Sequence, residues 1–144
     1  MTDFDELADD LDEIALHLKL EGNSYQANQY RKASDSLRRA DFLPPDPSQL
    51  DDIGEAMRDD IAEWRAFGKI DRLESMRDKR PWLAPLTRVA GLGPKTAQSL
   101  YEEKDITTID ELIEILDDGT IEEVSGIGPK TATKFRRSAK QLNR

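Results

Sequence analysis

Apolar residues recur at the three- and four-residue spacing of α-helices along most of this 144-residue chain. In the first half this spacing predicts four helices, at residues 4–20, 25–40, about 54–67 and about 70–76. Residues 22–24, Gly-Asn-Ser, break the pattern and supply a helix cap, the prolines at 44, 45 and 47 force a loop, and Gly68 ends the third helix. No stretch alternates apolar and polar residues as a strand would, so we expect an all-α protein.

The second half predicts shorter helices. We expect helices over residues 83–89, 97–101 and 132–142, and a capping-box sequence at Thr108 and Glu111 that opens another through Leu116. A second capping box, at residues 120–123, is expected to begin a short helix. The helical phase breaks at residues 78–81. We therefore predict an N-terminal four-helix domain, residues 1–78, and a second domain, residues 79–144.

A glycine turn appears twice in the second domain. Gly91-Leu92-Gly93 returns 35 positions later as Gly126-Ile127-Gly128, and each copy is followed by Pro-Lys-Thr-Ala. Glycine permits positive φ and close backbone approach, and proline suits the first position of a helix. The N–H groups that follow the proline would point outward without a partner inside the helix. Each turn therefore predicts an anion site.

The pattern of these turns resembles the helix-hairpin-helix motif, which implies that they grip nucleic-acid phosphates without regard to sequence. A hairpin kept only for helix packing, or for binding a protein, is the alternative. The residues expected to contact DNA are Gly91, Leu92, Gly93, Lys95, Thr96, Gly126, Ile127, Gly128, Lys130, Thr131, Lys134 and Arg137.

The net charge of −9 is unusual for a partner of a polyanion, but it is unevenly distributed. Residues 1–80 carry a net charge of −8 and residues 81–144 a net charge of −1. From Gly126 onward the chain has basic but no acidic side chains, which places positive charge beside the second hairpin. The abundance of Asp and Glu with few lysines resembles halophile proteins from salt-accumulating cells; an ordinary acidic protein is the alternative.

Composition excludes several classes of protein and of site. The chain has no cysteine, so disulfides and thiolate metal sites are excluded. No apolar run approaches the ~20 residues of a membrane span, and the acidic start lacks the pattern of a secretory signal, so we expect a soluble cytoplasmic protein without membrane contact. His17, the single histidine, is expected on a helix surface, and Trp64 and Trp82 in the core or at the domain junction.

Nearly the whole chain resembles the N-terminal region of family X DNA polymerases, in which a lyase-type domain precedes a DNA-gripping subdomain. The segments that carry this resemblance are residues 30–33, 53–61, 64, 68–70, 73–74, 86–97 and 106–112. The resemblance implies a degenerate helix-hairpin-helix in the first domain, a tandem of such motifs in the second, and a role in DNA repair or replication.

Departures from the family pattern argue against enzymatic activity. The chain ends before the palm carboxylates that polymerase chemistry requires. The lysine that forms the lyase Schiff base corresponds to Asp60, and a second family lysine to Ala56. Asp52 replaces the first glycine of the N-terminal hairpin. The family's 5′-phosphate contacts are matched only at Tyr30, Arg31 and Arg72.

The resemblance also implies a monovalent cation, Na⁺ or K⁺, held by the backbone carbonyls of Thr87, Val89 and Leu92. The equivalent carbonyls of the second hairpin belong to Glu122, Val124 and Ile127. We expect no other cofactor.

A DNA-binding protein without catalytic activity is therefore the expected function, with a repair or replication enzyme as a further partner. One alternative is a protein-interaction adaptor, in which the acidic first domain docks an enzyme. Another is a residual lyase that uses a different lysine, such as Lys69. The basic side chains of the second helix suit either nucleic-acid contact or ion pairs with the acidic first helix; they belong to Arg31, Lys32, Arg38 and Arg39.

Overall fold

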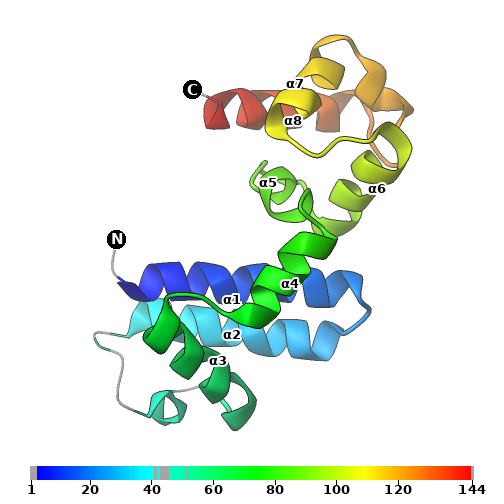
Figure 1. Cartoon of the computed structure of the whole chain (residues 1–144). Helices are drawn as coiled ribbons and strands as arrows, with labels where there is room; N and C mark the ends of the chain where they lie inside the picture. Colours follow the sequence, from blue (N-terminus) through cyan, green and yellow to red (C-terminus); the bar gives the residue numbers. More distant parts are fainter. Residues whose placement is uncertain (1–2, 41, 43–45, 51, 144) are drawn as a thin grey trace. The chain divides into compact units, whose positions relative to one another are not determined.

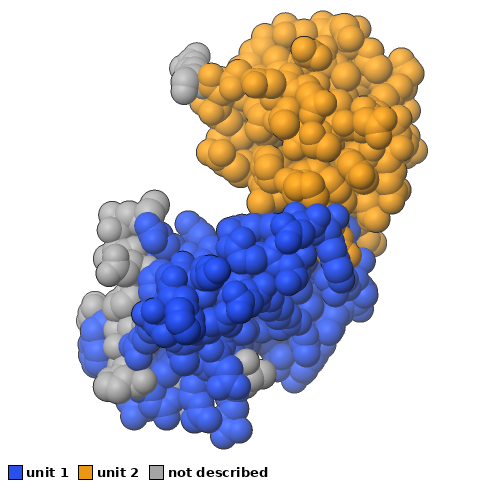
Figure 2. Space-filling model, viewed as in Figure 1, with its two compact units in different colours: residues 1–79 blue, residues 80–144 orange. Residues whose placement is uncertain are grey.

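The computed structural model describes residues 3–40, 42, 46–50 and 52–143, without the side chains of residues 3, 4, 48 and 56. All regular structure in this part of the chain is helical, as predicted (Figure 1). The chain forms two compact units, Met1–Lys79 and Arg80–Arg144 (Figure 2). The boundary predicted from sequence falls one residue earlier.

Unit 1 is built around a pair of long helices, α1 (Asp3–Leu20) and α2 (Ser24–Arg39), which lie side by side and run in opposite directions (Figure 1). The Asn23 side chain caps α2 by accepting a hydrogen bond from the Gln26 N–H. The 3₁₀ helix η1 (Pro47–Gln49), α3 (Glu55–Phe67) and α4 (Asp71–Lys79) complete the unit. Gly68 ends α3 at φ 73°, as the sequence predicted.

His17 is fully buried in α1, so its predicted place on the helix surface is wrong. Both α2 and α4 contact α1. A helix covered on two sides buries a wider stripe than the single face read from the spacing of its apolar residues. Trp64 is partly buried against the same core, as expected.

Unit 2 contains α5 (Leu83–Thr87), α6 (Pro94–Lys104), α7 (Ile109–Asp117), the 3₁₀ helix η2 (Thr120–Glu123) and α8 (Pro129–Leu142). The first hairpin joins α5 to α6, and the second joins η2 to α8. The buried Trp82 ring stacks on Tyr101, with ring centroids 5.1 Å apart. None of the described helices in either unit combines the length and the apolar character needed to cross a membrane.

The two capping boxes predicted in unit 2 have different outcomes. At α7 the Thr108 side chain accepts a hydrogen bond from the Glu111 N–H, and the Glu111 carboxylate accepts one from the Thr108 N–H, which confirms the first box. The short helix predicted at residues 120–123 is confirmed, but the second box is wrong. The Thr120 N–H donates instead to the Asp118 carboxylate at 2.8 Å, and Gly119, at φ 82°, precedes a short 3₁₀ helix.

Candidate nucleic-acid interface

The two hairpins of unit 2 share one backbone conformation. The first glycines, Gly91 and Gly126, have φ of 82° and 84°, in the left-handed region that favours glycine. The apolar residues at their centres, Leu92 and Ile127, are buried and anchor each turn to the core. The Leu92 N–H donates to the Val89 carbonyl at 3.0 Å, and the corresponding second-hairpin bond measures 3.2 Å. The sequence repeat is therefore a structural repeat.

The second glycine of each hairpin has a different role from the first. Gly93 and Gly128 are extended, with φ of −85° and −101°, a conformation that any residue adopts. A Cβ atom at either position would meet no protein atom within 4 Å. Packing within the protein does not require glycine here. The absence of a side chain leaves open space in front of the hairpin, where a ligand can approach the backbone.

The starts of α6 and α8 present unused donors toward that space. The first intrahelical bonds run from the Ala97 N–H to the Gly93 carbonyl and from the Ala132 N–H to the Gly128 carbonyl. The N–H groups of the two residues after each proline therefore precede the hydrogen-bonded part of their helix. No side chain caps either helix. These donors belong to Lys95, Thr96, Lys130 and Thr131.

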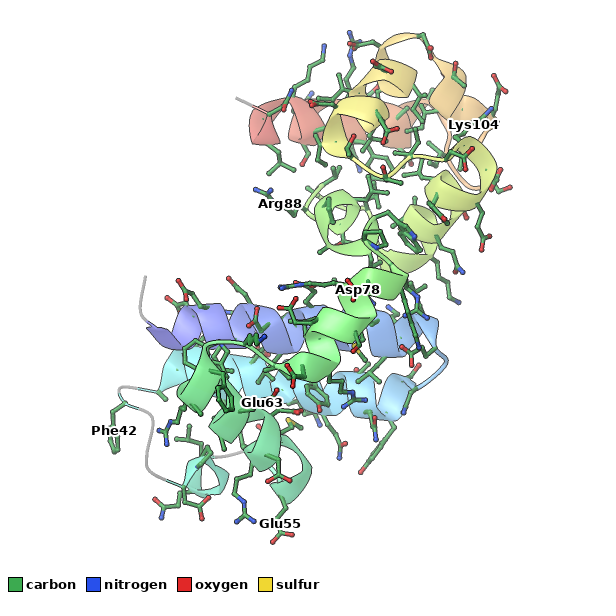
Figure 3. All side chains as sticks on the ribbon, in the orientation of Figure 1. Phe42, Glu55, Glu63, Asp78, Arg88 and Lys104 are labelled. Atoms are coloured by element: carbon green, nitrogen blue, oxygen red, sulfur yellow. The ribbon has the colours of Figure 1, made fainter. Side chains whose placement is uncertain are left out.

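Unit 1 contains a third turn of the same shape. Asp52 has φ 65°, Ile53 is buried, and Gly54 is the extended residue that precedes α3. The surrounding chemistry is different, because Asp52 replaces a glycine and Glu55 begins the helix where unit 2 has proline. The Glu55 side chain extends away from unit 1 (Figure 3). The N-terminal hairpin thus keeps its backbone but carries carboxylates at its first position and at the start of its helix, and Lys32 of α2 lines the same pocket.

Two of the three predicted 5′-phosphate residues lie together, but they bind each other. The buried Tyr30 hydroxyl donates to the Asp60 carboxylate at 2.6 Å and accepts from Arg72 at 2.8 Å. The Arg72 guanidinium also lies over the Tyr30 ring, 5.6 Å from its centroid. Burial and the hydrogen bond to Asp60 raise the pKa of Tyr30. Arg31 is exposed on α2 and takes no part in these hydrogen bonds. The side chain of Ala56 lies outside the described residues.

Other basic side chains of unit 1 pair with the acidic helix α1. Arg38 contacts Asp9 at 2.6 Å and Asp12 at 2.8 Å, so for this residue the ion-pair alternative is confirmed. Arg77 forms a two-pronged contact with Glu13, at 2.6 and 2.8 Å, and lies 3.6 Å from Asp10. Burial raises the pKa of Asp10 to about 6, although the Arg77 charge lowers it in part.

The basic residues of α8 divide into two groups. Arg136 and Lys140 both contact Asp117, at 2.9 and 3.1 Å, and these contacts hold the pKa of Asp117 below its usual value. Lys134 and Arg137 instead line a depression. Its other lining residues are Ala90, Gly91, Ser138 and Gln141. Nowhere in the described chain do Lys134 and Arg137 form an ion pair with a carboxylate.

The sequence placed the positive charge of α8 beside the second hairpin, and the structure adds a second location. The depression adjoins Gly91, so Lys134 and Arg137 also lie beside the first hairpin. Contacts far apart in sequence are responsible: the Ala90 N–H donates to the Ser138 hydroxyl at 2.8 Å. Sequence reasoning missed Ser138, because proximity along a helix does not reveal which loop the helix crosses.

Comparison with known proteins finds relatives of unit 2 and of most of the whole chain. Residues 83–141 match the family of SAM-like helix-hairpin-helix tandems. Over 130 residues, the chain is 30% identical to the DNA polymerase/3'-5' exonuclease PolX of Bacillus subtilis (strain 168). This match covers 87% of the chain and 23% of that enzyme, so the chain corresponds to less than a quarter of its relative's length.

Proposed function

Because this chain is homologous to the N-terminal region of PolX and contains a helix-hairpin-helix tandem, we propose that it is a non-catalytic protein that binds DNA without regard to sequence. One observation carries the proposal: the space in front of Gly93 and Gly128 is open, and unused N–H donors and lysines border it. The proposed setting is DNA repair or replication in the cytoplasm of a salt-accumulating cell.

The proposed contact is between each hairpin and a backbone phosphate. The N–H groups after Pro94 and Pro129 donate to the phosphate oxygens, and the helix dipole favours the negative charge. Lys95 and Lys130 are exposed at these helix starts and add charge. Phosphates are the same at every base pair, so such contacts position a protein on DNA without reading its sequence. N–H contacts also depend less on salt than lysine contacts do, because fewer counterions are released.

A monovalent cation at the first hairpin is part of the proposal. Carbonyl oxygens have two lone pairs, and the Val89 carbonyl uses one for the Leu92 N–H. A second lone pair of the Val89 carbonyl therefore stays free, and we propose that it binds Na⁺ or K⁺ together with the carbonyls of Thr87 and Leu92. Such an ion would offset the repulsion between a phosphate and the acidic protein.

The proposed absence of lyase activity rests on Asp60. A carboxylate cannot form an imine, and here it accepts a hydrogen bond from the buried Tyr30. Lys69, the alternative nucleophile, is exposed just beyond α3. Incubation with an abasic-site oligonucleotide and borohydride should leave the protein uncrosslinked. A covalent adduct that is lost in Lys69→Ala would establish the residual lyase instead.

A second candidate function is an adaptor for a repair or replication enzyme. Two large side chains of unit 1 favour it, because Tyr25 is 76% exposed and Phe67 is 73% exposed. Exposed aromatic residues are typical centres of protein interfaces. This function predicts no DNA binding even at low salt, whereas the proposed function predicts binding.

Fluorescence anisotropy with duplex, gapped and single-stranded DNA tests the proposal, with KCl varied from low to molar concentration. We expect binding to duplex DNA of any sequence, with a shallow dependence on salt. Preference for a gapped substrate would assign 5′-phosphate recognition to unit 1. Failure to bind any substrate at the lowest salt would overturn the proposal and leave the adaptor.

A further inference from the structure

The two helix-hairpin-helix motifs of unit 2 hold each other through matching contacts. The Ala90 N–H, beside the first hairpin, donates to Ser138 of α8 at 2.8 Å. The Ser125 N–H, beside the second hairpin, donates to Glu103 of α6 at 3.3 Å. Both pairs are related by the same 35-residue shift as the hairpins. Each hairpin is therefore braced by the second helix of the other motif, at equivalent positions.

The chemistry at these equivalent positions is opposite. The first hairpin meets the neutral Ser138, flanked by Lys134 and Arg137. The equivalent positions lie 35 residues earlier, on α6. Ser138 corresponds to Glu103, Lys134 to Ser99 and Arg137 to Glu102. By this shift, the two cations beside the first hairpin correspond to a hydroxyl and a carboxylate of α6. Glu103 brings a further carboxylate to the second hairpin.

We infer that the tandem is asymmetric: a DNA phosphate is bound chiefly at the first hairpin, where Lys134 and Arg137 of α8 complete the site, and Glu103 weakens the second. This inference rests on the proposed function and deepens it. From the sequence we expected DNA contacts at both hairpins and positive charge beside the second.

The ion pairs of α8 support this assignment. Asp117 occupies Arg136 and Lys140, whereas Lys134 and Arg137 border the depression beside Gly91. Cations already paired with a carboxylate gain less from a phosphate, because the existing contact must be given up. Lys134 and Arg137 have no such contact to lose within the described residues.

The direction of α8 extends the site along the DNA strand. Lys130, Lys134, Arg137 and Gln141 recur at intervals of four, three and four residues, so they share one face of the helix. At 1.5 Å per residue this face spans about 16 Å. It begins beside the second hairpin and reaches the depression at the first. A strand seated at the first hairpin therefore continues along basic side chains.

Two matched double variants of the full chain test the inference. Lys134→Ser with Arg137→Gln removes two charges from the depression. Arg136→Gln with Lys140→Ser removes the two charges of the same helix that are paired with Asp117. Anisotropy with duplex DNA is measured across a KCl series. We expect the first variant to make the slope of log K against log[KCl] shallower by about 1.8, and the second to leave it near the wild-type value.

Further variants test whether the charge of these side chains, and not their identity, determines DNA affinity. Lys134→Arg with Arg137→Lys should retain wild-type affinity, which shows that the surface tolerates substitution. Glu103→Ser copies the chemistry of Ser138 and should raise affinity roughly fivefold, by removing a carboxylate near the second phosphate. Circular dichroism confirms that each variant is folded.

The outcomes distinguish this inference from the proposed function. If wild-type protein binds DNA but the two charge-removal variants lower the slope equally, total charge governs binding and the asymmetry is overturned. An affinity unchanged by Glu103→Ser would likewise overturn the weakened second hairpin. If the wild-type protein binds no DNA at all, the proposed function itself fails.

Discussion

Units 1 and 2 contain the same turn in opposite chemical surroundings. Residues 52–54 and 91–93 share a left-handed first residue, a buried apolar centre and an extended glycine before a helix. The first turn is followed by Glu55, and the second by Pro94 and Lys95. The turn therefore forms without a glycine at its first position. We propose that charge and access around it decide whether a phosphate binds.

The two units also differ in the contacts of their basic side chains. In unit 1, Arg38 and Arg77 contact carboxylates of α1, and Arg72 contacts Tyr30. In unit 2, Lys95, Lys130, Lys134 and Arg137 form no ion pair within the described residues. These three arginines of unit 1 thus contribute to its internal contacts, whereas the four cations around the hairpins of unit 2 remain available to a ligand.

The largest expected effect comes from filling the open space in unit 2. Replacing both Gly93 and Gly128 with valine should lower duplex affinity roughly 100-fold or more, because two sets of hydrogen bonds to charged phosphates are blocked. Neither position needs positive φ or has an atom within 4 Å of a built Cβ, so helicity should change little. Anisotropy and circular dichroism measure the two effects.

Gly54→Val is the matched control for this prediction. Gly54 is extended at the start of a helix and has the same open surroundings, but it lies beside carboxylates. The substitution should leave DNA affinity unchanged. If Gly54→Val weakens binding as much as the double variant, the hairpins of the two units would be equivalent and the comparison would break down.

A smaller effect concerns Asp10, a partly buried carboxylate of unit 1. The pKa of Asp10 is about 6 in the folded protein against 3.8 in the unfolded chain, so folding strengthens proton binding. Its stabilising contribution is complete below pH 3.8 and is lost as the pH rises through 6. Asn resembles the protonated form. Asp10→Asn should therefore stabilise the protein by roughly 1 to 3 kcal/mol at pH 7.5 and by almost nothing near pH 4.

Urea unfolding at the two pH values measures this difference. DNA affinity at neutral pH should not change, because Asp10 belongs to unit 1. Equal stability of wild type and variant at pH 7.5 would show that Arg77 fully compensates the buried carboxylate.

The smallest effect concerns the left-handed residue of the unit 1 turn. Asp52→Gly should stabilise the protein by up to about 1 kcal/mol, because it removes the strain of a side chain at φ 65°. The greater freedom of glycine in the unfolded chain offsets part of this gain. Thermal unfolding measures the change. We expect no gain in DNA affinity, since Glu55 remains; a gain would mean that Asp52 alone separates the two turns.

The sequence by itself determined the local structure. Helical spacing, the cap at residues 22–24, Gly68 and the box at Thr108 and Glu111 predicted elements that the structure confirms, because these signals act within a few residues. The same holds for the repeated hairpins. The second box did not form, because the Thr120 N–H donates to the Asp118 carboxylate and not to Glu123. The sequence pattern alone does not show which of these two nearby carboxylates accepts the bond.

Only the tertiary structure decided which side chains meet. It buried His17 between helices, joined Asp60 and Arg72 through Tyr30, and brought Ser138 of α8 to the first hairpin. These contacts join residues far apart in the chain, and they depend on how helices cross. Sequence therefore specified two similar hairpins, and helix packing placed Lys134 and Arg137 beside the first and Glu103 beside the second.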